Sequence, residues 1–519
     1  MSLRNIVWIS VVMVLATLAL VLTRWRTITV YPQRYWCDPA VDELNGAIRA
    51  YEFIKHHSYF KVSPDKASRG AIEGMVRRID KYAVYIPPDE EILIGMPGSG
   101  RRFGTGLMVA AEDDKIVVVG SLPDSPAYRA GLFAPMEVIS INGISAKYLS
   151  EEQIQKMLQP TGKKGEDNEV VVALRRLRSS VGSNRVSEII VKRLKPERLK
   201  IRTVRGIVRG ESNRWHYILD KKRGIYYLRI SEFLDSTPTE LQEAYCQFDN
   251  PNGLILDLRD NPGGTLLSAV AVCDRFLSKG LIVQTVDRNG NRQPYYAHVD
   301  GTYPPIPMVV LINHRTASAA EIVAGALKIH NRAVIVGQES YGKWFIQKMF
   351  DLGKGLGKVY LTVGEYFLTA PAHSVQEGTA TMKSSGMRQS ETSPATSRSS
   401  LEENFRRRPR RHGVRPDFPL RLTVAAKKRL AILRLRAMAA LPPVDVVDES
   451  SQPKRPRTSS SVAAHTSELM REILEVDEQL ALALRILRES IDIFFEQEGE
   501  DLQEWRSSVL QERYSLEYR

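Results

Sequence analysis

Three loops in the middle of the chain carry residue types that could perform acyl transfer. Each follows a short apolar run that predicts a buried strand, and they span residues 259–264 (RDNPGG), 314–318 (HRTAS) and 338–343 (QESYGK). Apolar strands that alternate with helices are typical of a parallel sheet covered on both faces. In such a sheet, sites form outside the carboxyl ends of the strands. We therefore expect the three loops to lie together and to form one site.

The second of these loops supplies a nucleophile. Ser318 directly precedes an apolar helical segment, and the N–H groups at a helix start are unpaired and favour negative charge. The N–H of Ala319 is the expected first donor to an oxyanion. Either Gly263 or Gly264 can present a second N–H, because glycine permits close approach and unusual φ values. We assign this role to Gly263.

The third loop supplies a base. Lys343 can accept the hydroxyl proton of Ser318 if its amine is neutral, and burial favours the neutral form of lysine. Gln347 lies four residues further on, where it could orient the amine by a hydrogen bond. The remaining neighbours are apolar or aromatic, as this mechanism requires: Tyr341, Trp344, Phe345 and Ile346.

Each of these residues alone also has an ordinary structural interpretation. A serine after a strand usually caps a helix, a lysine after glycine is usually a solvated turn residue, and Pro-Gly-Gly is usually a turn. The joint occurrence of all three at successive strand ends favours catalysis.

Composition narrows the classes of function. The chain has 519 residues, of which 26% are charged and 43% hydrophobic, as in a globular protein of several domains. Much of its formal net charge of +13 sits in clusters at 406–411 and 454–457, within Ser/Pro-rich sequence. We interpret these clusters as solvated linker charge and expect no nucleic-acid partner. Three scattered cysteines and nine histidines without paired spacing predict no metal site, and the chemistry above needs no cofactor.

The N-terminus carries an apolar, uncharged run at residues 6–22. This length is at the short end of what spans a bilayer core of about 30 Å. No small-residue cleavage pattern follows, so we expect residues 1–25 to form an uncleaved membrane anchor. A cleaved signal segment is the alternative, and the flanking arginines do not fix the orientation.

The hydrophobic period changes several times after this segment. An apolar stripe at residues 466–498 predicts one long helix, which either packs on the chain's own core or mediates self-association. The expected regions are a helical segment (39–95), a small β-rich module (100–195), an α/β region (196–375), a disordered low-complexity insertion (376–412) and a C-terminal helical extension (421–519).

Residues 313–347 resemble the carboxyl-terminal processing peptidases, also called tail-specific proteases. The nucleophile of that family lies in a Ser-Ala-x-Glu-Ile context, which residues 318–322 match. Its lysine follows Tyr/Phe-Gly, as Lys343 does, and a glutamine lies four residues beyond. In addition, DLRDNPGG (257–264) resembles the family's oxyanion loop, and GVRPD (413–417) is similar to its closing motif.

The resemblance implies a Ser/Lys-dyad endopeptidase on a crotonase-like or ClpP-like α/β core, closed by residues 413–420. It also implies that residues 100–195 form an inserted PDZ domain. The backbone N–H groups of its carboxylate-binding loop would hold a substrate's C-terminus beside a sheet edge. By resemblance, that loop consists of Gly104, Thr105, Gly106 and Leu107.

We therefore expect a membrane-tethered serine endopeptidase whose catalytic part is periplasmic or extracytoplasmic. Its expected partners are proteins with flexible, apolar C-terminal tails. Two other classes remain open. A catalytically inactive PDZ scaffold would keep the same fold, and Trp344 favours it because the family usually has a small residue there. Acyl-CoA chemistry on a crotonase-like core is the third class, although a PDZ domain has no role in it.

Overall fold

The computed structural model describes residues 39–88, 101–112, 115–133, 136–159, 169–176, 188–210, 213–353, 355–368, 412–441, 459–496 and 509. The chain divides into two units, Met1–Tyr85 and Ile86–Arg519. The first contains the helices α2 (Pro39–His57) and α3 (Pro64–Ile79). The expected anchor at 1–25 and all but the last residue of the insertion at 376–412 lie outside the described residues. Within the described ranges, no helix is long and apolar enough to cross a bilayer.

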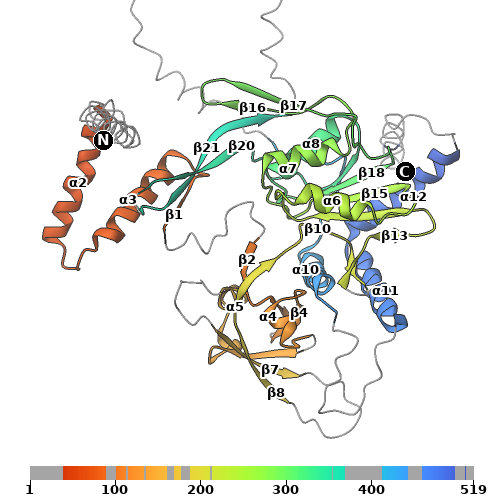
Figure 1. Ribbon diagram of the computed structural model, residues 1–519, viewed down its shortest axis with the longest axis horizontal. Helices are drawn as coiled ribbons and strands as arrows, with labels where there is room; N and C mark the ends of the chain where they lie inside the picture. Colours follow the sequence, from red (N-terminus) through yellow and green to blue (C-terminus); the bar gives the residue numbers. More distant parts are fainter. Residues whose placement is uncertain are drawn as a thin grey trace, which may run out of the picture. The chain divides into compact units, whose positions relative to one another are not determined.

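A largely parallel sheet lies at the centre of the larger unit (Figure 1). Its main strands β14, β15, β18, β19 and β22 are parallel neighbours in that order, and β10 and β13 both pair antiparallel with β14. β15, β18 and β19 are buried along their whole length, which explains their continuous apolar sequences. The strands are β10 (Val204–Arg205), β13 (Ile218–Asp220), β14 (Ile225–Ile230), β15 (Gly253–Asp257), β18 (Met308–Ile312), β19 (Val334–Gly337) and β22 (Phe418–Pro419).

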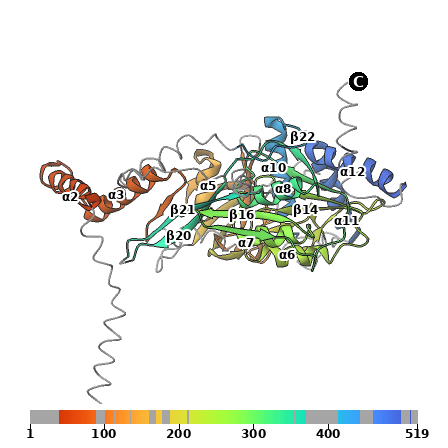
Figure 2. The same ribbon diagram turned by 90° about the horizontal axis from the view of Figure 1, so that it is seen from above.

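Helices cover both faces of this sheet (Figure 2). Successive side chains of a strand point to opposite faces, so Leu254 and Leu256 of β15 join one core while Ile255 joins the other. The first core is completed by α6 (Thr237–Tyr245), α7 (Leu266–Asp274) and α8 (Ala319–Ile329). The second is completed by α10 (Val424–Met438), α11 (Ser459–Val476) and α12 (Glu478–Glu496). This arrangement confirms the predicted α/β class.

A second, antiparallel sheet follows the site loops. Its strands pair in the order β20, β21, β16 and β17. They span Phe345–Asp351, Lys358–Phe367, Leu281–Asp287 and Arg292–Tyr296, respectively. The short strand β1 (Val84–Ile86) lies at the boundary between the two units.

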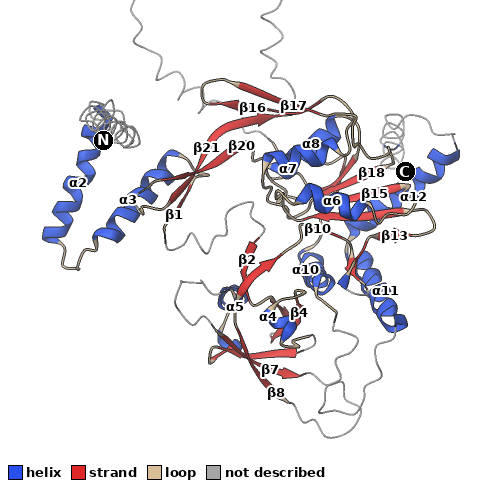
Figure 3. Ribbon diagram, in the orientation of Figure 1, coloured by secondary structure: helices blue, strands red, loops and turns tan. Residues whose placement is uncertain are grey.

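Residues 101–200 form the β-rich module (Figure 3). Its sheet has the order β3, β4, β5, β7 and β8, with β6 paired to β5, and its core contains Ile141, Ile154 and Val172. A separate antiparallel pair, β2 and β9, leads in and out of the module. The elements are β2 (Arg101–Gly104), β3 (Leu107–Glu112), β4 (Lys115–Ser121), α4 (Pro126–Arg129), β5 (Met136–Ile141), β6 (Ile144–Ser145), η2 (Ala146–Tyr148), α5 (Glu151–Leu158), β7 (Val170–Arg176), β8 (Ile189–Leu194) and β9 (Glu197–Lys200).

Helix α10 contacts both the central sheet and the β-rich module. Leu430, Leu433 and Ala437 belong to the core of the central sheet. Ile432, Leu435, Met438 and Ala439 pack against β3 and β4. The N–H of Ala440 then donates to the carbonyl of Ser121 at 2.8 Å.

The C-terminal stripe packs on the chain's own core. Leu469, Ile473, Leu480, Leu484, Leu487 and Ile491 are all buried against the central sheet. These side chains are therefore not available for self-association. The prediction of one long helix is wrong, because the chain breaks at Asp477 between α11 and α12. The Asp477 carboxylate accepts a hydrogen bond from the N–H of Leu480 at 3.1 Å, as a helix-capping residue does.

Replacing Leu487, which is fully buried, with alanine tests whether the C-terminal helices are part of the catalytic unit. We expect Leu487→Ala to lower the free energy of unfolding by about 2–5 kcal/mol, because it leaves a cavity. Arg485→Ala, on the exposed face of the same helix, should change it by less than about 0.5 kcal/mol. Urea denaturation followed by circular dichroism measures both, and equal midpoints for the two variants would contradict the packing.

Candidate active site

The three loops meet at the carboxyl ends of three neighbouring parallel strands, β15, β18 and β19. The backbone N–H of Ala317 donates to the carbonyl of Asn261 at 2.9 Å, which joins the second loop to the first. The N–H of Tyr341 donates to the carbonyl of Thr316 at 2.9 Å, which joins the third loop to the second. The loops that were predicted to form one site thus contact one another.

Ser318 lies at the turn between the second loop and α8. Its backbone has φ 56° and ψ −121°, a conformation that non-glycine residues rarely adopt. Such strain persists only where the surroundings hold it, and it gathers at functional sites. The side chain is half-buried, so Ser318 is partly accessible at the start of a helix.

The carboxylate of Glu321 holds this turn in place. Glu321 is fully buried, and its Oε2 accepts hydrogen bonds from the backbone N–H groups of Ser318 at 2.9 Å and Lys343 at 2.8 Å. Its Oε1 accepts from the hydroxyl of Ser340 at 2.5 Å and the N–H of Gly342 at 2.6 Å. Hydrogen bonds to a carboxylate are among the stronger ones in proteins. One side chain therefore binds the backbone of the nucleophile loop and of the lysine loop at the same oxygen atom.

Gly263 lies directly against Ser318. A Cβ atom at Gly263 would come within 2.7 Å of the Ser318 Cβ and 2.9 Å of the Ala319 N atom. Ala319 is the first residue of α8, so its N–H has no carbonyl partner within the helix. The missing side chain of Gly263, whose φ is +102°, leaves the space in which an oxyanion could reach the Ala319 N–H.

The N–H of Gly263 is already used within its own loop. It donates to the Asn261 Oδ1 at 2.8 Å, while the Asn261 amide donates to the carbonyl of Ile230 at 2.8 Å. Within the described part of the chain, no partner is found for the N–H of Gly264. The N–H that the sequence analysis assigned to the oxyanion, that of Gly263, is thus engaged by Asn261 in this structure.

Lys343 lies between the loop and β20 and is half-buried. Its Nζ donates to the Gln347 Oε1 at 2.5 Å, the orienting contact expected from the spacing. Trp344 and Ile346 pack against the first core, and the Trp344 ring contacts that of Tyr366. Tyr341 differs from the expectation, because its side chain is 60% exposed and adds little to the apolar surroundings of the amine.

The segment after the insertion completes the third loop. The Val414 N–H donates to the Ser340 Oγ at 2.6 Å, and the Ser340 N–H donates to the Val414 carbonyl at 3.1 Å. Asp417 forms an ion pair with Lys328 of α8 at 2.7 Å and accepts from the Ile335 N–H at 2.9 Å. The sequence motif at 413–417 therefore fixes the nucleophile helix and the lysine loop from outside.

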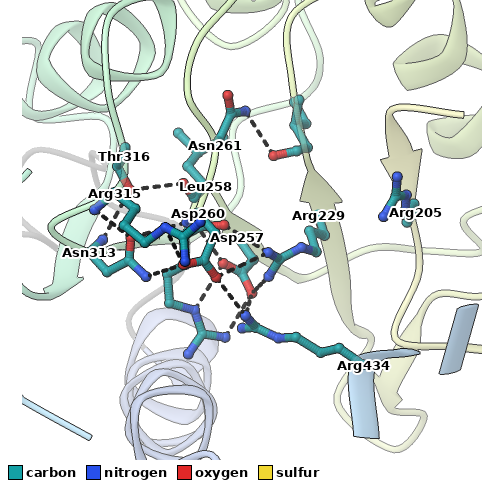
Figure 4. Close-up of polar contacts among 12 residues, drawn as sticks. Arg205, Arg229, Asp257, Leu258, Asp260, Asn261, Asn313, Arg315, Thr316 and Arg434 are labelled. Carbon is teal, nitrogen blue, oxygen red and sulfur yellow. Dashed lines mark hydrogen bonds and ion pairs between the residues drawn. The ribbon is translucent and has the colours of Figure 1, made fainter. Parts of the chain in front are cut away.

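A cluster of charged groups underlies the first loop (Figure 4). Burial alone would raise the pKa of Asp257, but the guanidinium groups of Arg259, Arg229 and Arg434 hold that pKa far below its ordinary value. A similar balance acts on Asp260, where burial raises the pKa but the charges of Arg229 and Arg434, together with the Asn313 hydrogen bond, leave that pKa below its ordinary value. Both carboxyl groups are therefore ionised at neutral pH.

The expected carboxylate-binding loop of the β-rich module lies at the start of β3. The Thr105 N–H donates to the Leu158 carbonyl of α5 at 3.1 Å, and the Leu107 N–H donates to the Thr105 Oγ1 at 3.3 Å. A Cβ atom at Gly106 would meet the Ser125 side chain at 2.2 Å. The N–H groups of Thr105 and Leu107 are therefore engaged by the protein itself, and among the described residues no hydrogen bond joins this loop to Ser318.

Several important residues carried no role in the sequence analysis. Glu321 was visible only as part of a motif, and the charges at Asp257, Arg259, Arg434 and Asp477 were not linked. Ionisable residues at the end of an apolar strand were the available signal, because buried charges need partners. The described residues contain no cluster of three or more His, Cys, Asp or Glu side chains that could hold a metal ion.

The sequence model of peptidase family S41 matches residues 224–380, which include all three loops. The class of protein that this model describes is a peptidase. The carboxyl-terminal-processing protease of Picosynechococcus sp. is 30% identical over 355 residues, covering 67% of this chain and 78% of that protein. The corresponding protease of Bartonella bacilliformis is 32% identical over 335 residues, covering 62% and 71%. The chain belongs to the family of carboxyl-terminal processing proteases.

CtpA of Bacillus subtilis is 31% identical over 337 residues and is matched over 66% of its length, which is just under two thirds. Among solved structures, the photosystem II D1 C-terminal processing protease is 26% identical, with a TM-score of 0.34 and coverage of 62% of this chain and 81% of that one. The family assignment rests on the sequence relatives.

Glu321→Gln tests the junction between the loops. The amide group cannot accept hydrogen bonds through its nitrogen, so buried donors lose their partner, at about 1–3 kcal/mol for each. We expect the free energy of unfolding to fall by about 2–4 kcal/mol. Glu339→Gln, which changes an exposed carboxylate in the third loop, is the control and should be near neutral. Thermal denaturation that does not separate the two variants would contradict the role of Glu321.

Proposed function

We propose that this chain is a serine endopeptidase with Ser318 as nucleophile and Lys343 as general base. The observation that carries the proposal is the Glu321 carboxylate, whose Oε2 accepts from the backbone N–H groups of both residues. This brings the two loops to one point, with a strained serine at a helix start. Family membership supports the same reaction class.

The reaction would begin with attack of the Ser318 Oγ on the scissile carbonyl carbon, while the hydroxyl proton passes to the neutral Lys343 amine. The new oxyanion would accept hydrogen bonds from the Ala319 N–H and from Gly264 or Gly263. As the C–N bond breaks, the lysine would return the proton to the leaving amine. Water would then cleave the acyl-enzyme by the same two steps, with Lys343 again as the base.

Gln347 would orient the amine. Its Oε1 accepts from the Lys343 Nζ at 2.5 Å, and this contact would orient a neutral amine so that its lone pair faces the serine hydroxyl. Ala319 and Gly263 would frame the oxyanion, since any side chain at residue 263 would occupy that space. This division of roles gives each predicted catalytic residue a defined task.

We further propose that the β-rich module is a PDZ domain that recruits substrates by their C-terminal tails. β3 is an edge strand of its sheet, and an edge strand can pair with an extended peptide. At present α5 lies along this edge, where Gln155 Nε2 donates to the Val109 carbonyl at 3.5 Å. A substrate tail would replace these α5 contacts beside β3, and the backbone N–H groups of Gly104, Thr105, Gly106 and Leu107 would hold its terminal carboxylate. Residues 1–25 would tether the enzyme to a membrane on its extracytoplasmic side.

Removing either member of the dyad should abolish cleavage. We expect Ser318→Ala and Lys343→Met to lower kcat by about 10³-fold or more, because neither attack nor proton transfer has a substitute. The measurement is the initial rate of cleavage of an unfolded protein substrate such as casein.

Lys348→Met is the matched control, since Lys348 is an exposed lysine on β20, which begins two residues after Lys343. It should retain the wild-type rate. Cleavage by Ser318→Ala at the wild-type rate would contradict the proposal, and an inactive wild type would favour the scaffold alternative.

The tail proposal makes a separate prediction about substrate termini. A peptide substrate with an apolar C-terminal tail should be cleaved with a kcat/KM about tenfold above that of the same peptide with an amidated C-terminus, because one charge-assisted hydrogen-bonding group is lost. Equal kcat/KM values for the two peptides would mean that no carboxylate is bound.

A further inference from the structure

The loop that carries Gly263 begins with charges that lie out of contact with water. Asp257 and Arg259 are 0% and 1% exposed, and charges buried to this degree are stable only when paired. The Arg259 guanidinium donates to Asp257 at 2.7 Å and to both oxygens of Asp477 at 2.6 and 2.7 Å. Asp477 lies between α11 and α12, so a residue of the C-terminal extension helps to neutralise the buried charge of Arg259.

Helix α10 adds a second link to the same loop. Nη1 of Arg434 donates to Asp260 at 3.0 Å, and its Nη2 donates to Asp257 at 3.1 Å. One planar guanidinium thus bridges the two carboxylates of the loop, a geometry that lysine cannot reproduce. Arg229 of β14 pairs with the same oxygen of Asp257, Oδ2, at 3.0 Å and lies 3.5 Å from Asp260.

At contacts of 3.1 Å or less, the cluster joins three guanidinium groups and three carboxylates, whose formal charges cancel. The arginines are Arg229, Arg259 and Arg434, and the acids are Asp257, Asp260 and Asp477. The largely exposed Arg315 adds a longer ion pair to Asp260 at 3.9 Å. These paired charges hold the loop in place.

Asp260 links the charge cluster to the catalytic site. Its φ of 61° is unusual for a non-glycine residue and is maintained only by its surroundings. Asn313 contacts both its backbone and its carboxylate, at 3.0 and 2.9 Å. The next residue, Asn261, accepts from the Ala317 N–H and binds the Gly263 N–H. The position of Gly263 against Ser318 is thus only three residues from the Arg434 contact.

We propose that Arg434 is a positioning residue that keeps the 257–264 loop in the conformation needed for oxyanion binding beside Ser318. This inference rests on the proposed peptidase function. In physical terms, a helix from the C-terminal extension supplies part of the catalytic geometry. This helix lies outside the segment that matches the family model. A misplacement of about 1 Å in such a site can cost about 10²-fold in rate.

Arg434 can be tested without removing the most buried charge. Its side chain is 21% exposed, and α10 is fixed independently by Leu430, Leu433 and Ala437 in the core. We expect Arg434→Met to lower kcat by about 10–100-fold with KM changed by less than about twofold. Arg434→Lys should be intermediate, because an ammonium group restores charge but not the bridge. Arg429→Met, an exposed arginine on the same helix, is the control and should match the wild type.

Two further measurements separate positioning from loss of stability. A peptide boronate, which adds to the serine and places an oxygen in the oxyanion site, should bind Arg434→Met more weakly by the factor lost in kcat. Amide hydrogen exchange should rise about fivefold or more in peptides covering 257–265 and stay constant in β14. Wild-type kcat, unchanged boronate affinity, or a rise in exchange spread over the whole sheet would each overturn the proposal.

The hydrogen-exchange measurement distinguishes failure of the Arg434 proposal from failure of the proposed peptidase function. If the wild type and Ser318→Ala are equally unable to cleave, the proposed function fails. The hydrogen-exchange comparison between Arg434→Met and Arg429→Met still decides whether Arg434 holds the loop, because it needs no turnover.

Discussion

The site depends first on one buried carboxylate. Glu321 sits in the first turn of the nucleophile helix and accepts four hydrogen bonds, three from backbone N–H groups and one from a hydroxyl. Because Ser318 and Lys343 share one oxygen of this group, neither loop can move without leaving a buried donor unsatisfied. The strained backbone of Ser318 is stable only under that constraint. The proposed dyad thus depends on a residue that need not touch the substrate.

A second set of charges holds the loop that carries Gly263 in place. Glu321 fixes two loops with backbone donors, whereas the cluster around Asp257 fixes the third with guanidinium groups from β14, the loop itself and α10. The two sets are linked by the Asn261–Ala317 hydrogen bond. The catalytic geometry is therefore held by buried polar contacts on both sides, while the apolar cores on the two faces of the sheet supply the stability.

The sequence was most informative where chemically reactive residues follow apolar strands. Continuous apolar strands predicted the α/β class, and the placement of the RDNPGG, Ser318 and Lys343 loops at successive strand ends predicted that they meet. The break at Asp477 was missed because the apolar stripe continues on both sides of it, whereas Asp477 caps the second helix and pairs with Arg259. The links from Arg434 and Asp477 to the loop could not be derived either, because contacts between residues far apart in sequence leave no periodic signal.

The order of these residues along the chain determines when the charge cluster can form during synthesis. Arg434 follows Asp260 by 174 residues, and Asp477 follows Arg259 by 218. A nascent chain that already contains Ser318 and Lys343 still lacks these two side chains until residues 434 and 477 have been synthesised. During that interval Arg259 has no partner from the C-terminal extension and the glycine loop is not yet held. Translation order would thus delay assembly of the proposed catalytic geometry until both residues have left the ribosome.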